Sequence, residues 1–181
     1  MKKIPVGIEN FKEMIDNQYY YIDKTELIND VMNEKLVFYT RPRRFGKTLN
    51  MSMLYYFFSH KEKDNAYLFD GLNVSKDKET MLHQNQYPVI FMTLKDMKNS
   101  SMNLQKEQFL SLIQEEIDSY YVILESNKVS DLYKERLRKL LKGEGTENDL
   151  INSLKSLSLA LKQYYQKNVI LLIDEYDVPL Q

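Results

Sequence analysis

The sequence contains no cysteine, only two histidines, and no apolar run long enough to cross a membrane. The absence of cysteine excludes disulfides, thiol nucleophiles and zinc sites built from thiolates, and it favours a reducing compartment. A membrane-spanning helix needs about 18 apolar residues, and the two lysines near the N-terminus are not followed by such a stretch. We therefore expect a cytoplasmic protein without a membrane partner. His60 and His83 each stand alone without metal-ligand spacing, so we expect them at the surface or in packing.

The sequence also lacks an excess of charge of either sign. Its 25 basic and 26 acidic residues give a formal net charge of −1. This balance argues against a large nucleic-acid-binding surface, although it leaves room for a local basic patch. Hydrophobic residues make up 43% and charged residues 28%, as in an ordinary globular protein. A chain of 181 residues is long enough for one domain with a substantial core.

Three short apolar runs predict buried strands at residues 36–39, 89–94 and 169–173. Apolar residues at helical spacing predict helices near residues 8–15, 27–32, 49–58, 109–124, 132–141 and 150–164, and residues 60–86 are expected to form a connection with one short helix. Asp23 stands three residues before Glu26, as in a capping box, which predicts a helix cap there. Gly143 and Thr146 are expected to end one helix and begin the next. The order of strands and helices favours an α/β layered sheet.

The strand at 36–39 runs into a turn with the chemistry of a phosphate site. Gly46 lets the backbone approach a phosphate group closely, and Lys47 can place its ammonium near the β- and γ-phosphates. Thr48 can offer its hydroxyl to Mg²⁺. The usual pattern begins with a further glycine, but Arg41 stands in its place and Pro42 removes one N–H group.

The strand at 169–173 ends in two adjacent carboxylates, and this second motif supports the first. Asp174 would lie at the carboxyl end of that strand, where it can hold a magnesium-bound water. Glu175 can act as the general base on an attacking water. A continuously apolar strand of this kind is typical of a parallel sheet buried on both faces.

Three separated motifs in this order resemble those of the bacterial AAA-ATPase-like family. They are YIDKT at 21–25, RPRRFGKTL at 41–49 and DEYDVP at 174–179. The resemblance extends over nearly the whole chain, and it makes Arg41 a feature of the family's own phosphate loop. Longer members of this family often carry a predicted PD-(D/E)XK nuclease-like domain at the C-terminus.

The resemblance implies a P-loop NTPase three-layer sandwich with a parallel sheet in the order 5-1-4-3-2. Residues 36–39, 89–94 and 169–173 would be strands 1, 2 and 3, and the sheet would be truncated after strand 3. We expect residues 1–181 to be the N-terminal part of a single domain. In that reading, residues 1–34 form a lead-in and 35–181 an incomplete nucleotide-binding core, so the sequence resembles a fragment that would be poorly stable and inactive alone.

The leading hypothesis is a magnesium-dependent ATPase that binds ATP and, when full-length, hydrolyses it. Lys47 and Glu175 are the candidate catalytic residues, and Thr48 and Asp174 are the candidate magnesium ligands. The residues predicted to contact the nucleotide are Arg43, Arg44, Phe45, Gly46, Lys47, Thr48 and Leu49. Arg43 and Arg44 contact phosphate or, alternatively, pair with acids such as Asp174 or Asp177, and Asp177 could support the site indirectly.

Two alternatives remain open at this stage. The protein could be a nucleotide-dependent switch that binds ATP without useful turnover, or the ATPase module of a nuclease-linked protein that processes nucleic acid. Self-association and a C-terminal nuclease-like domain are possible partners in the full-length protein.

Overall fold

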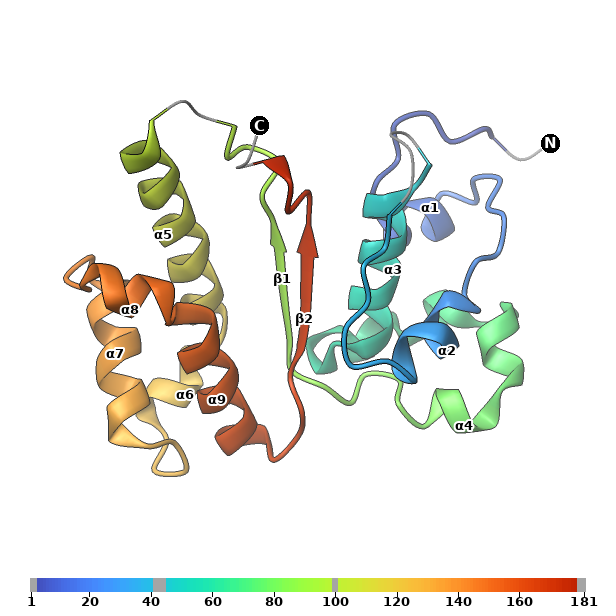
Figure 1. Cartoon of the computed structure of the whole chain (residues 1–181). Helices are drawn as coiled ribbons and strands as arrows, with labels where there is room; N and C mark the ends of the chain where they lie inside the picture. Colours follow the sequence, from blue (N-terminus) through green and yellow to red (C-terminus); the bar gives the residue numbers. More distant parts are fainter. Residues whose placement is uncertain (1–2, 41–44, 99–100, 179–181) are drawn as a thin grey trace. The chain divides into compact units, whose positions relative to one another are not determined.

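The structure is a computed structural model that describes residues 3–40, 45–98 and 101–178 (Figure 1). The chain divides into two compact units, Met1–Val89 and Ile90–Gln181. The first unit contains α1 (Phe11–Asp16), α2 (Leu27–Met32), α3 (Lys47–Phe58), two 3₁₀ segments, η1 (His60–Phe69) and η2 (Asn73–Lys76), and α4 (Lys78–Met81). The second contains α5 (Met102–Ser119), α6 (Val122–Glu125), α7 (Asp131–Leu141), α8 (Glu147–Ile151), α9 (Ser153–Tyr165) and β2 (Ile170–Asp174), while β1 (Val89–Thr93) begins at the boundary. The organisation as a single domain therefore stays a prediction.

The core of the first unit is aromatic and is built around α3. Phe57 is fully buried and meets Phe69 of η1 with ring centroids 5.1 Å apart. Phe11 of α1 packs on the same ring at 5.2 Å. Edge and tilted contacts of this kind add about 0.5–1.5 kcal/mol each beyond the burial of area. Phe57 and Phe58, in the aromatic run at 55–58, are both buried.

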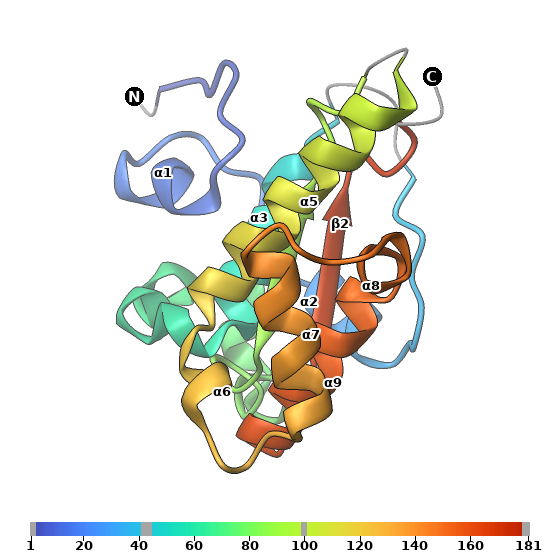
Figure 2. The same cartoon turned by 90° about the vertical axis from the view of Figure 1, so that its left-hand side faces the viewer.

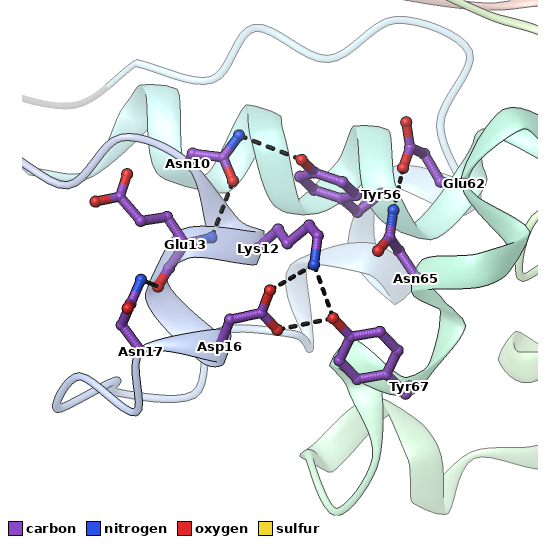
Figure 3. A network of polar contacts seen from close by, with 9 residues as sticks. All are labelled: Asn10, Lys12, Glu13, Asp16, Asn17, Tyr56, Glu62, Asn65 and Tyr67. Carbon is purple, nitrogen blue, oxygen red and sulfur yellow. Dashed lines mark hydrogen bonds and ion pairs between the residues drawn. The ribbon is translucent and has the colours of Figure 1, made fainter.

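Polar contacts fasten α1 to this core (Figure 3). The Lys12 ammonium pairs with Asp16 and donates to the Tyr67 hydroxyl over 2.8 Å, and that hydroxyl donates to Asp16 over 2.8 Å. The hydrogen bonds that the Lys12 ammonium donates to Asp16 and Tyr67 raise the pKa of Lys12. Asn10 caps α1 through the Glu13 N–H and reaches the Tyr56 hydroxyl of α3 over 3.3 Å.

Asp23 does not cap α2, which corrects the capping-box prediction. Its carboxylate accepts the backbone N–H of Thr25 over 2.9 Å, the hydroxyl of Thr25 over 2.7 Å and the N–H of Asn73 over 2.7 Å. The N-cap of α2 is Glu26, which makes no side-chain capping bond. Burial alone would raise the pKa of Asp23, but the hydrogen bonds outweigh it and lower the pKa. Asp23 therefore joins residues 23–25 to η2 instead of starting a helix.

In the second unit, helices cover one face of the sheet formed by β1 and β2 (Figure 2). Ile90 and Met92, two residues apart on β1, pack into a cluster with buried residues of α5, α6, α7 and α9. This two-residue period is that of a strand with one face on a helical layer. Gly143, with φ of 72°, follows α7, and Thr146 forms a capping box with Asp149 at α8, so both helix boundary predictions are confirmed.

The sheet of the described residues has two strands. β1 and β2 are neighbours and run in the same direction (Figure 1). This mixed arrangement is compatible with an α/β fold. The three-layer P-loop sandwich and the full 5-1-4-3-2 order stay predictions.

Two strand predictions need correction. Residues 36–39 form no strand, and Leu36 and Phe38 are 72% and 68% exposed. A strand requires backbone hydrogen bonds to a neighbouring strand, and the sheet among the described residues contains β1 and β2 alone. For the same reason β2 is an edge strand in the described structure, and Leu171 is 43% exposed where burial on both faces was expected.

Candidate functional site

The predicted phosphate turn opens α3 as the sequence requires. Gly46 is the N-cap of this helix in the left-handed region, with φ of 75° and ψ of 27°. Glycine adopts this conformation without the clash that a Cβ atom introduces. The carbonyl of Gly46 accepts the first helical hydrogen bond, from the N–H of Asn50 over 3.0 Å.

The first turn of α3 presents donors and no competing negative charge. Its N-cap, Gly46, has no side chain that could cap it, and the turn contains no acidic residue. The N–H groups of Lys47, Thr48 and Leu49 have no acceptor within the helix, because the first turn of any α-helix leaves its donors unpaired. Together with the positive end of the helix dipole they favour an anion such as a phosphate.

The side chains of the first turn are available for contact with a ligand. Lys47, Thr48 and Leu49 are half-buried, and Phe45 is 58% exposed. Lys47 carries an ammonium and Thr48 a hydroxyl, and both residues belong to the turn that also supplies the backbone N–H donors. Arg43 and Arg44, like Arg41 and Pro42, lie outside the described residues, so their predicted contacts stay predictions.

The acidic pair lies at the carboxyl end of β2. Asp174 is its last residue and is buried, and its backbone carbonyl accepts the N–H of Leu94 over 3.0 Å. One carboxylate oxygen, Oδ1, accepts the N–H of Glu175 over 3.0 Å. The other, Oδ2, is buried without a hydrogen-bond partner among the described residues. A buried carboxylate oxygen without a donor is costly, and a hard cation such as Mg²⁺ or its bound water would satisfy it.

Glu175 has an unusual backbone for a non-glycine residue. Its φ is 55°, in the left-handed region, and its carbonyl accepts the N–H of Val178 to close a turn. Its side chain is half-buried, and Tyr176 and Asp177 after it are exposed. Backbone strain of this kind persists where the surroundings fix it, and it is concentrated at functional sites.

The candidate residues are divided between the two units. The first unit supplies a helix N-terminus with a lysine and a threonine, and the second supplies a carboxylate at a strand end followed by a glutamate. Hydroxyl and carboxylate oxygens are the ligand types that magnesium prefers. In the described part of the chain no three His, Cys, Asp or Glu residues gather as a metal site. A magnesium ion that relies on phosphates and waters needs fewer protein ligands than that.

Asn50 of α3 and Tyr39, which precedes the phosphate turn, form a polar contact that the sequence motifs did not predict. Asn50 is 2% exposed, and its side-chain amide donates to the Tyr39 hydroxyl over 2.7 Å. The available signal was an amide side chain inside the otherwise apolar stretch 49–58. A buried amide needs a hydrogen-bond partner, so its presence there predicts a polar contact.

Among the described residues no helix is long and apolar enough to span a membrane.

Comparison with known proteins identifies the family. A protein of Azotobacter chroococcum mcd 1, called "Uncharacterized protein in vnfD 5'region", is 39% identical over 75 residues. The match covers 40% of this chain and 14% of that protein, so the chain corresponds to a small part of this relative's length. No solved structure shows significant similarity to the chain. The family model described as "Predicted AAA-ATPase" matches residues 5–181, and the chain therefore belongs to the AAA-ATPase-like family.

Proposed function

We propose that this chain binds Mg·ATP and that the full-length protein hydrolyses it. The observation that carries the proposal is the uncapped start of α3, where Gly46 in the left-handed conformation precedes Lys47 and Thr48. Membership of a family of predicted ATPases supports the same reaction class. We place the reaction in the cytoplasm, with ATP as substrate.

The phosphates would be held by backbone and side chain together. The N–H groups of Lys47, Thr48 and Leu49 would donate to phosphate oxygens, and the ammonium of Lys47 would neutralise the β- and γ-phosphates. Phe45, Arg43 and Arg44 are proposed nucleotide contacts from the preceding turn. The arginines would add charge where the family's loop lacks its first glycine.

The magnesium ion would be held by the hydroxyl of Thr48 and, directly or through water, by Asp174. The unpaired and buried Oδ2 of Asp174 supports this assignment. When bound, the ion would offset the negative charge of the phosphates. Because the N–H of Glu175 holds Oδ1, the carboxylate has a fixed orientation before any ligand arrives.

Glu175 would accept a proton from the attacking water as general base. Proton transfer requires the Glu175 carboxylate to lie within hydrogen-bond reach of that water, so the direction of the Glu175 side chain is decisive. The left-handed backbone at Glu175 turns the chain directly after the strand and thereby sets that direction. Asp177 is proposed to support this pair indirectly.

Calorimetric titration of the full-length protein with Mg·ATP tests the phosphate assignment. Lys47→Ala is expected to weaken binding at least tenfold, since it removes a charge-assisted contact of about 1.5–3 kcal/mol. Lys35→Ala is the matched control, because Lys35 is an exposed lysine of the same unit. Equal affinity in Lys47→Ala and the wild type would refute the assignment. A parallel titration with Mg·GTP measures the choice of base.

Phosphate release from Mg·ATP separates hydrolysis from binding alone. Glu175→Gln is expected to keep nucleotide affinity within a few-fold and to lower turnover at least 100-fold, as loss of a general base does. Glu144→Gln, an exposed position, is its control. Tight binding by the wild type without phosphate release would select the nucleotide-dependent switch instead. Nucleotide-stimulated, salt-sensitive binding of short DNA would support the nuclease-linked role.

A further inference from the structure

We infer that Tyr39 and Asn50 act as a positioning pair that holds the phosphate-binding turn at the start of α3. This inference rests on the proposed function, because it assigns residues that support Gly46, Lys47 and Thr48. Neither residue is expected to touch the nucleotide. Their effect would be to keep the donors of the first turn in a fixed direction.

Asn50 is placed to hold two parts of the site at once. Its backbone N–H donates to the carbonyl of Gly46 over 3.0 Å, and its side-chain amide donates to the hydroxyl of Tyr39 over 2.7 Å. The first bond closes the first helical turn on the left-handed glycine. The second reaches a residue eleven positions earlier in the chain. One buried residue thus joins the helix start to the segment that precedes the turn.

Tyr39 lies in a segment that forms no strand. In residues 36–40, the side chains of Leu36 and Phe38 are exposed by 72% and 68%. Tyr39 itself is half-buried, and its hydroxyl ends on an amide that is 2% exposed. A hydrogen bond to a buried amide gives the segment a defined point of attachment to α3.

The same helix offers a matched control bond between an asparagine and a tyrosine. Near its other end, the hydroxyl of Tyr56 accepts the side-chain amide of Asn10 over 3.3 Å (Figure 3). Both pairs join α3 to an earlier segment through a phenol. The Tyr39 pair lies at the phosphate turn, whereas the Tyr56 pair lies about two and a half helical turns away from Lys47.

The first test uses the protein without nucleotide. Amide hydrogen exchange is expected to speed up at least fivefold at the N–H of Asn50 in Tyr39→Phe, because loss of the phenol hydroxyl leaves the Asn50 side-chain amide without its acceptor and loosens the first turn. Tyr56→Phe is expected to leave that exchange rate unchanged. Unchanged exchange in Tyr39→Phe would overturn the inference, whatever nucleotide the protein binds.

The second test measures Mg·ATP affinity. Urea titrations at the same temperature first establish that each variant is fully folded in the absence of urea. Tyr39→Phe is expected to weaken binding on the order of tenfold, since small displacements of positioning groups carry losses of this size or more. Tyr56→Phe should stay within twofold of the wild type. A loss of equal size in both variants would indicate a general effect on the helix and would overturn the inference.

A double-mutant cycle separates this inference from the proposed function. If Tyr39 acts through the first turn, Tyr39→Phe should cost much less affinity in a Lys47→Ala background than in the wild type. Fully additive losses would show that Tyr39 acts independently, against the inference. If Lys47→Ala alone does not weaken binding, the proposed function fails. If Lys47→Ala weakens binding and Tyr39→Phe does not, the positioning pair alone fails.

Discussion

The backbone N–H of Glu175 donates to Oδ1 of Asp174 over 3.0 Å, so the second acid of the pair holds the carboxylate of the first. This bond forms while Glu175 has a φ of 55°. The strained turn and the orientation of the buried Asp174 side chain are therefore parts of one local arrangement. Variants that relax this turn should therefore change the free energy of unfolding and the rate of phosphate release in opposite directions.

Replacing Glu175 with glycine should stabilise the fold while removing activity. A non-glycine residue in the left-handed region costs about 1–2 kcal/mol, and the glycine variant removes this cost. Part of the resulting gain in stability is offset because glycine has greater freedom in the unfolded chain. We expect the free energy of unfolding to rise by about 0.5–1 kcal/mol in urea titrations. Phosphate release is expected to fall at least 100-fold, as expected for Glu175→Gln, because both variants lack the general base.

Gln166→Gly is the control for this prediction. Gln166 ends α9 with a φ of 54°, so it has the same strain at a position outside the candidate site. It should gain similar stability and keep full activity. A loss of stability in both glycine variants would contradict the view that the left-handed backbone is strained in this protein.

Replacing Gly46 with alanine should weaken both stability and nucleotide binding. A Cβ atom at Gly46 would meet no atom of the described residues within 4 Å, so the expected cost comes from the φ of 75°. We expect a loss of about 1–2 kcal/mol in the free energy of unfolding. Gly143, with φ of 72° and equally open space, should lose similar stability as alanine.

The two alanine variants should differ in titrations with Mg·ATP. Gly46→Ala shifts the backbone donors of the phosphate turn, whereas Gly143→Ala lies after α7 in the second unit. We therefore expect weaker binding in Gly46→Ala and wild-type binding in Gly143→Ala. Equal affinities in both variants would count against a phosphate at the start of α3.

Replacing Thr25 with valine should destabilise the first unit although the shape is conserved. Thr25 is fully buried, its hydroxyl donates to Asp23, and its Oγ1 accepts the N–H of Val74 over 3.0 Å. Valine leaves the buried Val74 N–H unpaired, which costs about 1–3 kcal/mol. Urea unfolding measures the loss.

Thr93→Val is the matched control for Thr25→Val. The Thr93 hydroxyl is exposed and accepts a longer bond of 3.4 Å from the N–H of Lys95. We expect a change within about 0.5 kcal/mol there. A stability loss of Thr25→Val no larger than this would show that the hydrogen bonds of residues 23–25 do not hold the unit together.

Sequence periodicity predicted the helices better than it predicted the strands. Helices depend on bonds within a segment, so α2 appears at the predicted residues 27–32, and α3 lies within two residues of its predicted start. A strand depends on a neighbour far along the chain. The apolar run at 36–39 therefore looked like a strand in the sequence, yet it forms none in the described structure.

The site was predictable where a motif fixes local geometry and not where a side chain finds a distant partner. The left-handed Gly46 and the start of α3 follow from the Gly-Lys-Thr turn itself. Asp23 had the spacing of a helix cap, but its carboxylate bonds to Asn73, which lies 50 residues later. Local spacing contains no information about such a partner, and the same holds for the bond from Asn50 to Tyr39.

The stability of the protein should fall as the pH drops below about 6.5, with His60 as one cause. Burial lowers the pKa of His60, the hydrogen bond to the Tyr87 carbonyl opposes this, and Lys61 and Lys63 lower it further. The unfolded chain therefore takes up a proton near pH 6.5 while the folded protein resists until its lower pKa is reached. Stability contributed by neutral His60 is complete above pH 6.5, declines as the pH falls below it, and levels off beneath the folded pKa.

Urea titrations between pH 5 and 8 measure this dependence, and His60→Gln should flatten it. One group contributes at most about 1.4 kcal/mol per pH unit, and the half-buried ring of His60 should contribute less than that limit. The backbone N–H of His60, which donates to the Tyr87 carbonyl over 2.9 Å, remains in the variant, so the change isolates the imidazole. An identical slope in His60→Gln and the wild type would show that other groups cause the acid sensitivity.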